Sequence, residues 1–161
     1  MAEPTVLDLI RLEDKRETSG HRVVVRVLGR YDPGVLSGHD FLDAEIVVTT
    51  PCVSATFDVT LLPDDLEQWE TALDALEAGT FVYWLTSGRT PSLKIEPISW
   101  SGFVVSVHDG PASGVTVTVP LSNPTAGLIY KQRDLLEAVR RAYPQQVIET
   151  RSGRNWYRPE A

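Results

Sequence analysis

The sequence predicts an α+β domain, in which about eight strands, mainly antiparallel, form a bent sheet or open sandwich with two helices packed against it. Three observations predict this class. Residues 22–61 alternate apolar and polar side chains through three successive segments, as strands with one buried face do. Segments after residues 62 and 125 change to the helical period of about 3.6. Turn residues separate four further short strands between these helices.

The first half of the chain is expected to form a meander of antiparallel strands. We expect these strands at residues 5–12, 22–30, 41–49 and 53–61. In the last of them every odd position is apolar and every even position is polar. This pattern is typical of a strand with one buried face and one hydrated face.

Two amphipathic helices are expected. Pro63 occupies a first helical position, and acidic residues follow it where the helix N-terminus is electropositive. The apolar stripe of this helix consists of Leu66, Trp69, Leu73 and Leu76. Gly79 provides a left-handed stop. The second helical pattern begins after residues 123–125 and ends at Pro144.

The second half is expected to repeat the strand pattern of the first. We expect strands at residues 80–85, 91–99, 102–108 and 115–121. Each half ends with a Val- and Thr-rich strand that leads through a proline into a helix. This likeness leaves open whether the two halves arose by an ancient duplication. We interpret residues 1–144 as a single α+β domain. Residues 145–161 form a C-terminal tail without a strong period, and partial order in this tail stays open.

Composition restricts the classes of partner. The 161 residues include 22 acidic and 15 basic side chains, and the formal charge is −7. Such a field repels nucleic acid and anionic lipid and favours a basic protein partner. The single cysteine excludes an internal disulfide framework. We see no secretion signal and no apolar run of about 18 residues, so we expect a cytoplasmic protein that does not enter membranes. The oligomeric state stays open.

Motifs that carry chemistry are missing from the sequence. It contains no Gly-x-Ser-x-Gly and no phosphate-binding Gly-x-x-x-x-Gly-Lys pattern. Asp32, His39, Asp40 and Asp43 lack metal-ligand spacing, and His39 with Asp40 fits a turn that its own side chains cap. We therefore assign no catalytic residue, no cofactor and no metal.

Three arginines of the second predicted strand could form a basic stripe that holds phosphate groups. Arg22, Arg26 and Arg30 occupy one phase of this strand. The outward acidic residues expected on the next two strands are Asp43, Glu45 and Asp58. We expect cross-strand pairing with these acids to neutralise the stripe.

Aromatic residues divide into two groups. Trp69 and Trp84 lie on the apolar phase of their elements and are expected in the core. Other aromatic and basic residues lack a surrounding buried period, and such residues anchor protein interfaces. The candidate partner-binding residues are Trp100, Arg154, Trp156, Tyr157 and Arg158. The competing interpretation for the last four is an arm that docks on its own domain or stays disordered.

Several segments carry a family resemblance. Residues 23–30, 33–36, 38–46 and 63–70 resemble a family of small uncharacterised actinobacterial proteins, and the resemblance covers roughly residues 5–144. It implies no catalytic residues, because the family is catalogued as a domain of unknown function. More distantly, the order of strands, a Trp-Leu-Leu helix that ends in Gly, and further strands is similar to immunity proteins of the wall-associated toxin type.

Together these observations favour a non-enzymatic, acidic protein-binding module. Toxin immunity is its most concrete version. One alternative is a small enzyme or small-molecule-binding domain with a pocket between sheet and first helix, around Trp69 and Trp84. Another alternative is a structural accessory domain.

Overall fold

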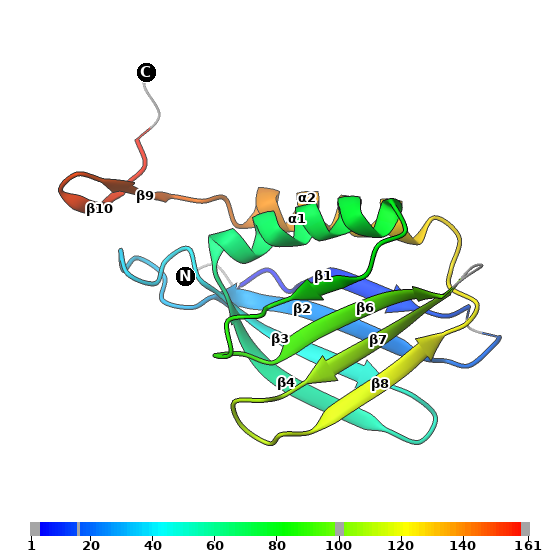
Figure 1. Ribbon diagram of the computed structural model, residues 1–161. Helices are drawn as coiled ribbons and strands as arrows, with labels where there is room; N and C mark the ends of the chain where they lie inside the picture. The colour runs from blue at the N-terminus through cyan, green and yellow to red at the C-terminus, as the bar shows by residue number, and fades with distance from the viewer. Residues whose placement is uncertain (1–3, 16, 99–101, 159–161) are drawn as a thin grey trace.

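Two facing antiparallel sheets and a pair of helices make up the body of the protein (Figure 1). The computed structural model describes residues 4–15, 17–98 and 102–158. The first sheet contains β1 (Leu7–Glu13), β2 (Arg22–Arg30), β3 (Leu42–Thr49) and β4 (Ser54–Leu61), in that order. The second sheet contains β5 (Val82–Trp84), β6 (Ser92–Ile98), β7 (Gly102–His108) and β8 (Thr116–Leu121). The helices are α1 (Pro63–Glu77) and α2 (Leu128–Ala142). The predicted α+β class is confirmed.

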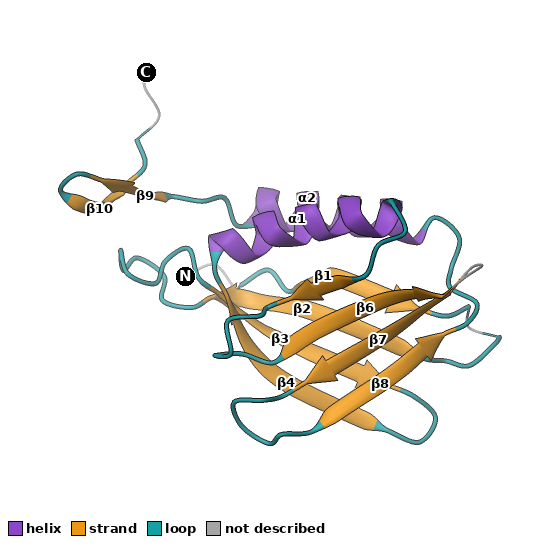
Figure 2. Ribbon diagram, viewed as in Figure 1, coloured by secondary structure: helices purple, strands orange, loops and turns teal. Residues whose placement is uncertain are grey.

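Each half of the chain has the same order of elements. A four-stranded meander leads into a helix of 15 residues, first in β1–β4 with α1 and then in β5–β8 with α2. The two helices lie side by side along one open edge of the facing sheets, above β1 and β5 (Figure 2). α2 packs on β1, and α1 packs on β5. The helix pair therefore covers the first strand of each sheet.

Two tryptophans fill the space between α1 and the second sheet. Trp69 is 0% and Trp84 is 1% exposed, and their ring centroids lie 5.4 Å apart. The indole Nε1 of Trp84 donates to the backbone oxygen of Asp65 at 2.8 Å. Both side chains are core residues, as expected. They fill the region between the sheet and α1 in which the alternative interpretation places a ligand pocket.

A buried amide closes the outer edge of β1. Gln132 of α2 is 1% exposed. Its Oε1 accepts from the backbone nitrogen of Arg11 at 2.7 Å, and its Nε2 donates to the backbone oxygen of Arg11 at 2.9 Å. The side chain thus replaces a neighbouring strand at this point, which satisfies two backbone groups that an edge strand leaves unpaired.

A β-bulge separates the arginines that the sequence places on one face. The register between β2 and β3 shifts between Val27 and Gly29, and Arg30 then lies opposite the buried Leu42. Such a bulge re-aims the residues that follow it. The prediction of one shared face is therefore wrong for Arg30, which turns away from the face that carries Arg26.

Only part of the expected cross-strand pairing forms. Arg26 lies 3.8 Å from Glu45. Within the described ranges, Asp43 and Asp58 take part in no ion pair. The outer face of the first sheet therefore keeps an excess of negative charge on β3 and β4.

The tryptophan pair gives a direct test of the core. We expect Trp69→Ala to lower the free energy of unfolding by about 3 to 5 kcal/mol, because it leaves a cavity between helix and sheet. The Nε1 of Trp69 is buried without a hydrogen-bond partner among the described residues. Trp69→Phe removes that donor and keeps an aromatic ring, so its cost should be only about 1 to 2 kcal/mol. Chemical denaturation of both variants checks the order. An unchanged midpoint for Trp69→Ala would contradict the packing.

Candidate protein-binding surface

A largely buried ion pair joins the end of β2 to the loop 31–40, and its arginine also reaches the chain at the end of α2. Arg30 Nη1 donates to Asp40 Oδ1 at 3.2 Å, and the two side chains are 13% and 7% exposed. The same guanidinium donates to the backbone oxygens of His39 and Pro144, both at 2.9 Å. The ring of Tyr143 lies 5.7 Å from the guanidinium carbon. One cation thus holds the loop 31–40 against the C-terminal end of α2.

Asp40 also anchors the chain that follows α2. Its carboxylate accepts from the backbone nitrogens of Gln146 and Val147 at 2.9 and 2.7 Å. Beside it, His39 Nδ1 accepts from the backbone nitrogen of Gly34 at 2.8 Å, and Nε2 lies 2.6 Å from Gln146 Oε1. Since Nδ1 accepts, Nε2 carries the proton in this arrangement. His39 therefore bonds within the turn, as expected, and His39 and Asp40 together also hold the C-terminal tail.

The tail forms an ordered hairpin that the sequence pattern does not indicate. It consists of β9 (Val147–Thr150) and β10 (Gly153–Trp156). Gly153 takes a φ of 112°, which few other residues adopt. Asn155 Nδ2 donates to Thr150 Oγ1 at 2.6 Å and ties the two strands together. We call the loop 31–40 and residues 145–158 the terminal lobe.

The terminal lobe contains four of the five predicted partner-binding residues. Trp156 packs its ring edge-on against His39, with centroids 4.8 Å apart, and is still 38% exposed. Tyr157 is 55% exposed, and Arg158 is exposed as well. Arg154 donates to the backbone oxygen of Ser37 at 3.3 Å. These residues belong to an arm docked on its own domain, and part of their surface stays open. Trp100 lies outside the described residues.

Further apolar side chains accompany them on the terminal lobe. Those that are exposed by more than a third are Tyr31, Val35, Leu36 and Ile148. Several large exposed apolar residues on one small part of a protein indicate an interaction surface. The sequence indicates them poorly, because they stand in a loop and a hairpin without a buried period.

The first helix carries uncompensated negative charge at its N-terminal half. α1 has six acidic residues and no basic one. At its C-terminal half, Arg133 of α2 lies 2.8 and 2.7 Å from two of these carboxylates, and Arg140 lies 2.8 Å from a third. Asp65 accepts from the backbone nitrogen of Leu62 at 2.8 Å, and burial raises its pKa. Asp64 and Glu67 have no cationic partner within the described part of the chain.

An exposed aromatic pair lies beside these two acids. Phe81 and Tyr83 are each 56% exposed and pack edge-on, with ring centroids 5.6 Å apart. A shallow groove of about 680 Å³ runs between the pair and α1, and Asp64 and Glu67 line it. The alternation in residues 80–85 places both aromatic rings on the exposed face of the strand, while Trp84 lies on the buried face. This alternation could have identified them from the sequence. Sequence reasoning missed them because it followed only the buried phase.

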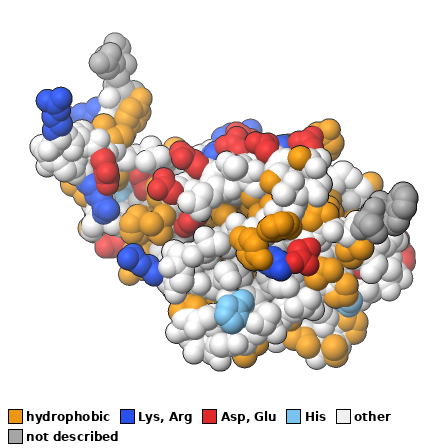
Figure 3. All heavy atoms as spheres, viewed as in Figure 1, with side chains coloured by type: hydrophobic (Ala, Val, Ile, Leu, Met, Phe, Trp, Pro, Cys, Tyr) orange, Lys and Arg blue, Asp and Glu red, His pale blue; other side chains and the backbone are white. Residues whose placement is uncertain are grey.

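The terminal lobe and the aromatic pair belong to one continuous surface. A second groove of about 380 Å³ is lined by Leu36 and Arg154 of the terminal lobe and by Asp64 of α1. Asp64 therefore borders both grooves. Figure 3 shows acidic side chains between the projecting lobe at the upper left and the hydrophobic group at the centre of the same face. We call this combined area the acidic–aromatic surface.

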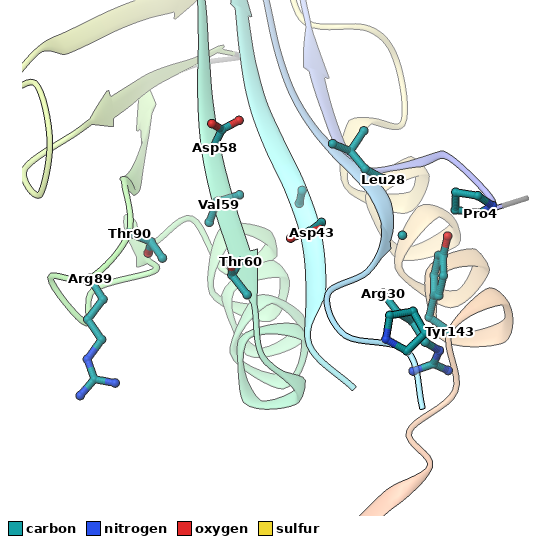
Figure 4. A pocket seen from close by; sticks show the side chains of 13 residues that line it. Pro4, Leu28, Arg30, Asp43, Asp58, Val59, Thr60, Arg89, Thr90 and Tyr143 are labelled. Carbon is teal, nitrogen blue, oxygen red and sulfur yellow. The ribbon is translucent and has the colours of Figure 1, made fainter. Parts of the chain in front are cut away.

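Another groove lies on the first sheet. It has a volume of about 990 Å³, and Asp43, Asp58 and Arg89 are among its lining residues (Figure 4). No three His, Cys, Asp or Glu side chains in the described ranges come together to hold a metal ion. No helix in these ranges is long and apolar enough to cross a membrane.

The role of Asp40 can be tested by removing its carboxylate. Asp40→Ala leaves Arg30 buried without its partner, so we expect the free energy of unfolding to fall by about 3 kcal/mol. The amide hydrogens of Gln146 and Val147 lose their acceptor, and their hydrogen exchange should accelerate. Asp58→Ala is the matched control, because this exposed carboxylate makes no ion pair among the described residues. Unchanged exchange at both amides in Asp40→Ala would contradict the docking of the tail.

Comparison with known proteins places most of the chain in a family. The profile of a family described as "Family of unknown function (DUF5959)" matches residues 7–144. This region contains both sheets and both helices, and the hairpin follows it. No curated protein and no solved structure matches the chain significantly.

Proposed function

We propose that this chain, which belongs to the family of unknown function DUF5959, is a non-enzymatic module that binds a basic protein through the acidic–aromatic surface. One observation carries the proposal. Exposed apolar side chains of the terminal lobe and the Phe81–Tyr83 pair lie on either side of Asp64 and Glu67, whose charges are not compensated among the described residues. Exposed aromatic side chains are frequent anchors of protein interfaces, and charged residues beside them select a partner of complementary charge.

The two components of the surface have different roles in binding. The formal charge of −7 and the free carboxylates of α1 attract a basic partner over a distance, which raises the association rate and makes it salt-dependent. Burial of aromatic rings in the complex sets the dissociation rate. Trp156 is already held by His39, so it loses little conformational freedom when a partner covers it.

Immunity against a bacterial toxin is the most concrete version of this function. A toxin that acts on nucleic acid carries a basic surface, which the N-terminal half of α1 complements. In this version the protein is cytoplasmic, where such a toxin acts, and blocks the toxin by covering its surface. The distant similarity to immunity proteins of the wall-associated toxin type supports this choice, as does the absence of catalytic motifs from the sequence.

The proposal is tested with a basic partner that is cross-linked to the wild-type protein in its native cytoplasm, identified and purified. We expect the double replacement of Phe81 and Tyr83 by serine to raise the dissociation rate about tenfold or more, because anchor residues dominate binding energy. Glu67→Lys should slow association and flatten its salt dependence. Surface plasmon resonance at several salt concentrations measures both.

Controls separate this surface from general effects. Tyr130→Ala removes a ring that is 69% exposed on α2, and it should leave both rates unchanged. Replacement of Trp156 and Tyr157 by alanine tests the contribution of the terminal lobe. If all these variants bind like the wild type, the acidic–aromatic surface is not the binding site.

A further inference from the structure

Three of the four outer sheet edges are closed or interrupted. α2 covers β1 through Gln132, and α1 packs along β5. β8 contains Pro120, which has no backbone N–H, and the oxygen of Pro120 lies 2.7 Å from His21 Nδ1. These are devices by which proteins protect strand edges. They leave β4 as the remaining long edge of the two sheets.

β4 lacks such protection along its length. The strand has eight residues, Ser54–Leu61, without a proline or a lysine, and its register with β3 is continuous. In the described part of the chain, its backbone hydrogen bonds are those of the ladder with β3. The outward-facing backbone groups of β4 are therefore free to pair with another strand.

The charge pattern beside this edge selects the kind of strand that fits. A row of charged residues crosses the outer face of the first sheet through Asp8, Arg26, Glu45 and Asp58, which lie opposite one another in register. Arg26 lies 3.1 Å from Asp8 and 3.8 Å from Glu45, so its charge is shared by two acids. Asp58 ends the row on β4 with Glu45 directly opposite. Like charges in this position are destabilising, and a cation on a fifth strand would relieve the repulsion.

Space for an extended segment exists at the same place. The groove of about 990 Å³ crosses the first sheet from Leu28 of β2 to Val59 and Thr60 of β4, and Arg89 and Thr90 line it as well. Figure 4 shows Arg89 and Thr90 on the loop beside the open margin of β4. The part of the groove beside β4 therefore borders the free edge, and Asp58 lines it.

We propose that β4 accepts an extended basic segment of a partner protein as a fifth, edge-adding strand. Backbone hydrogen bonds to β4 provide the affinity, and lysine or arginine at alternate positions provides the specificity, as in other strand additions. A second copy of this chain fits poorly as the added strand. The charged residue of β4 is Asp58, so two paired β4 strands would contribute two aspartates, and each copy has a formal charge of −7. The edge of β4 is separate from the acidic–aromatic surface, so either proposal can be disproved without the other.

Synthetic peptides test the strand addition directly. The probe is a blocked ten-residue peptide that alternates lysine with valine, and its control alternates glutamate with valine. We expect the lysine peptide to shift the backbone amide signals of β4 in NMR spectra and to protect them from hydrogen exchange. N-methylation of every peptide nitrogen should abolish both effects, because it removes the backbone donors on both edges of the peptide strand. Binding that survives N-methylation would overturn strand addition in favour of simple charge attraction.

Matched charge variants locate the site. Asp58→Lys and Asp134→Lys change the net charge equally, but Asp58 lies on β4 and Asp134 is an exposed residue of α2, outside both proposed surfaces. We expect Asp58→Lys to weaken peptide binding about tenfold and Asp134→Lys to leave it within about twofold, since cross-strand charge pairs act only between neighbours. Equal weakening by both variants would overturn the assignment to β4. Concentration-dependent dimerisation of the free protein, lost in Asp58→Lys, would assign the edge to a second copy and also overturn it.

Discussion

The closure of two sheet edges by the helix pair is the constraint on which the rest of the fold depends. Gln132 satisfies the backbone of Arg11 on β1, and the indole of Trp84 binds the backbone of α1. Both contacts require that each helix lies at one fixed position relative to its sheet. With the helices fixed, the N-terminal half of α1 and the C-terminal end of α2 both point towards the terminal lobe, and β4 stays on the opposite, uncovered margin.

Electrostatic pairing between the helices divides α1 into two parts. Arg133 and Arg140 of α2 neutralise the carboxylates of its C-terminal half, so the remaining field is concentrated near Asp64 and Glu67. At the terminal lobe, Arg30 and Asp40 neutralise each other in the same way. What stays exposed there is mostly apolar. The boundary between internally paired and free charges therefore defines the acidic–aromatic surface more sharply than the total charge does.

Most secondary structure could be predicted from the sequence, because local periodicity determines it. The bounds of β2 and β7 agree with the expectation, and those of α1 differ only at its end. The bulge at Leu28 could not be predicted, since Val24 and Leu28 are apolar at positions of the polar phase and the pattern therefore does not mark where the register shifts. The hairpin was missed because its order depends on Asp40, more than 100 residues away in sequence. Of the candidate site, the sequence indicated Trp156 and Tyr157 but not the grooves, which arise from elements that meet only in the folded chain.

The distance along the chain between Arg11 and Gln132, 121 residues, has a consequence for biosynthesis. A ribosome makes β1 first, and domains begin to fold from the N-terminus as they emerge. The nascent first sheet therefore has two open edges, β1 and β4, until α2 leaves the exit tunnel. The charged residues Asp8, Arg11 and Glu13 on β1 suit this interval, because charges on an edge discourage pairing with other chains. If translation stops before α2 is made, the released chain has an unpaired β1 edge, which α2 covers in the finished protein. Chaperones would have to cover this edge to prevent aggregation.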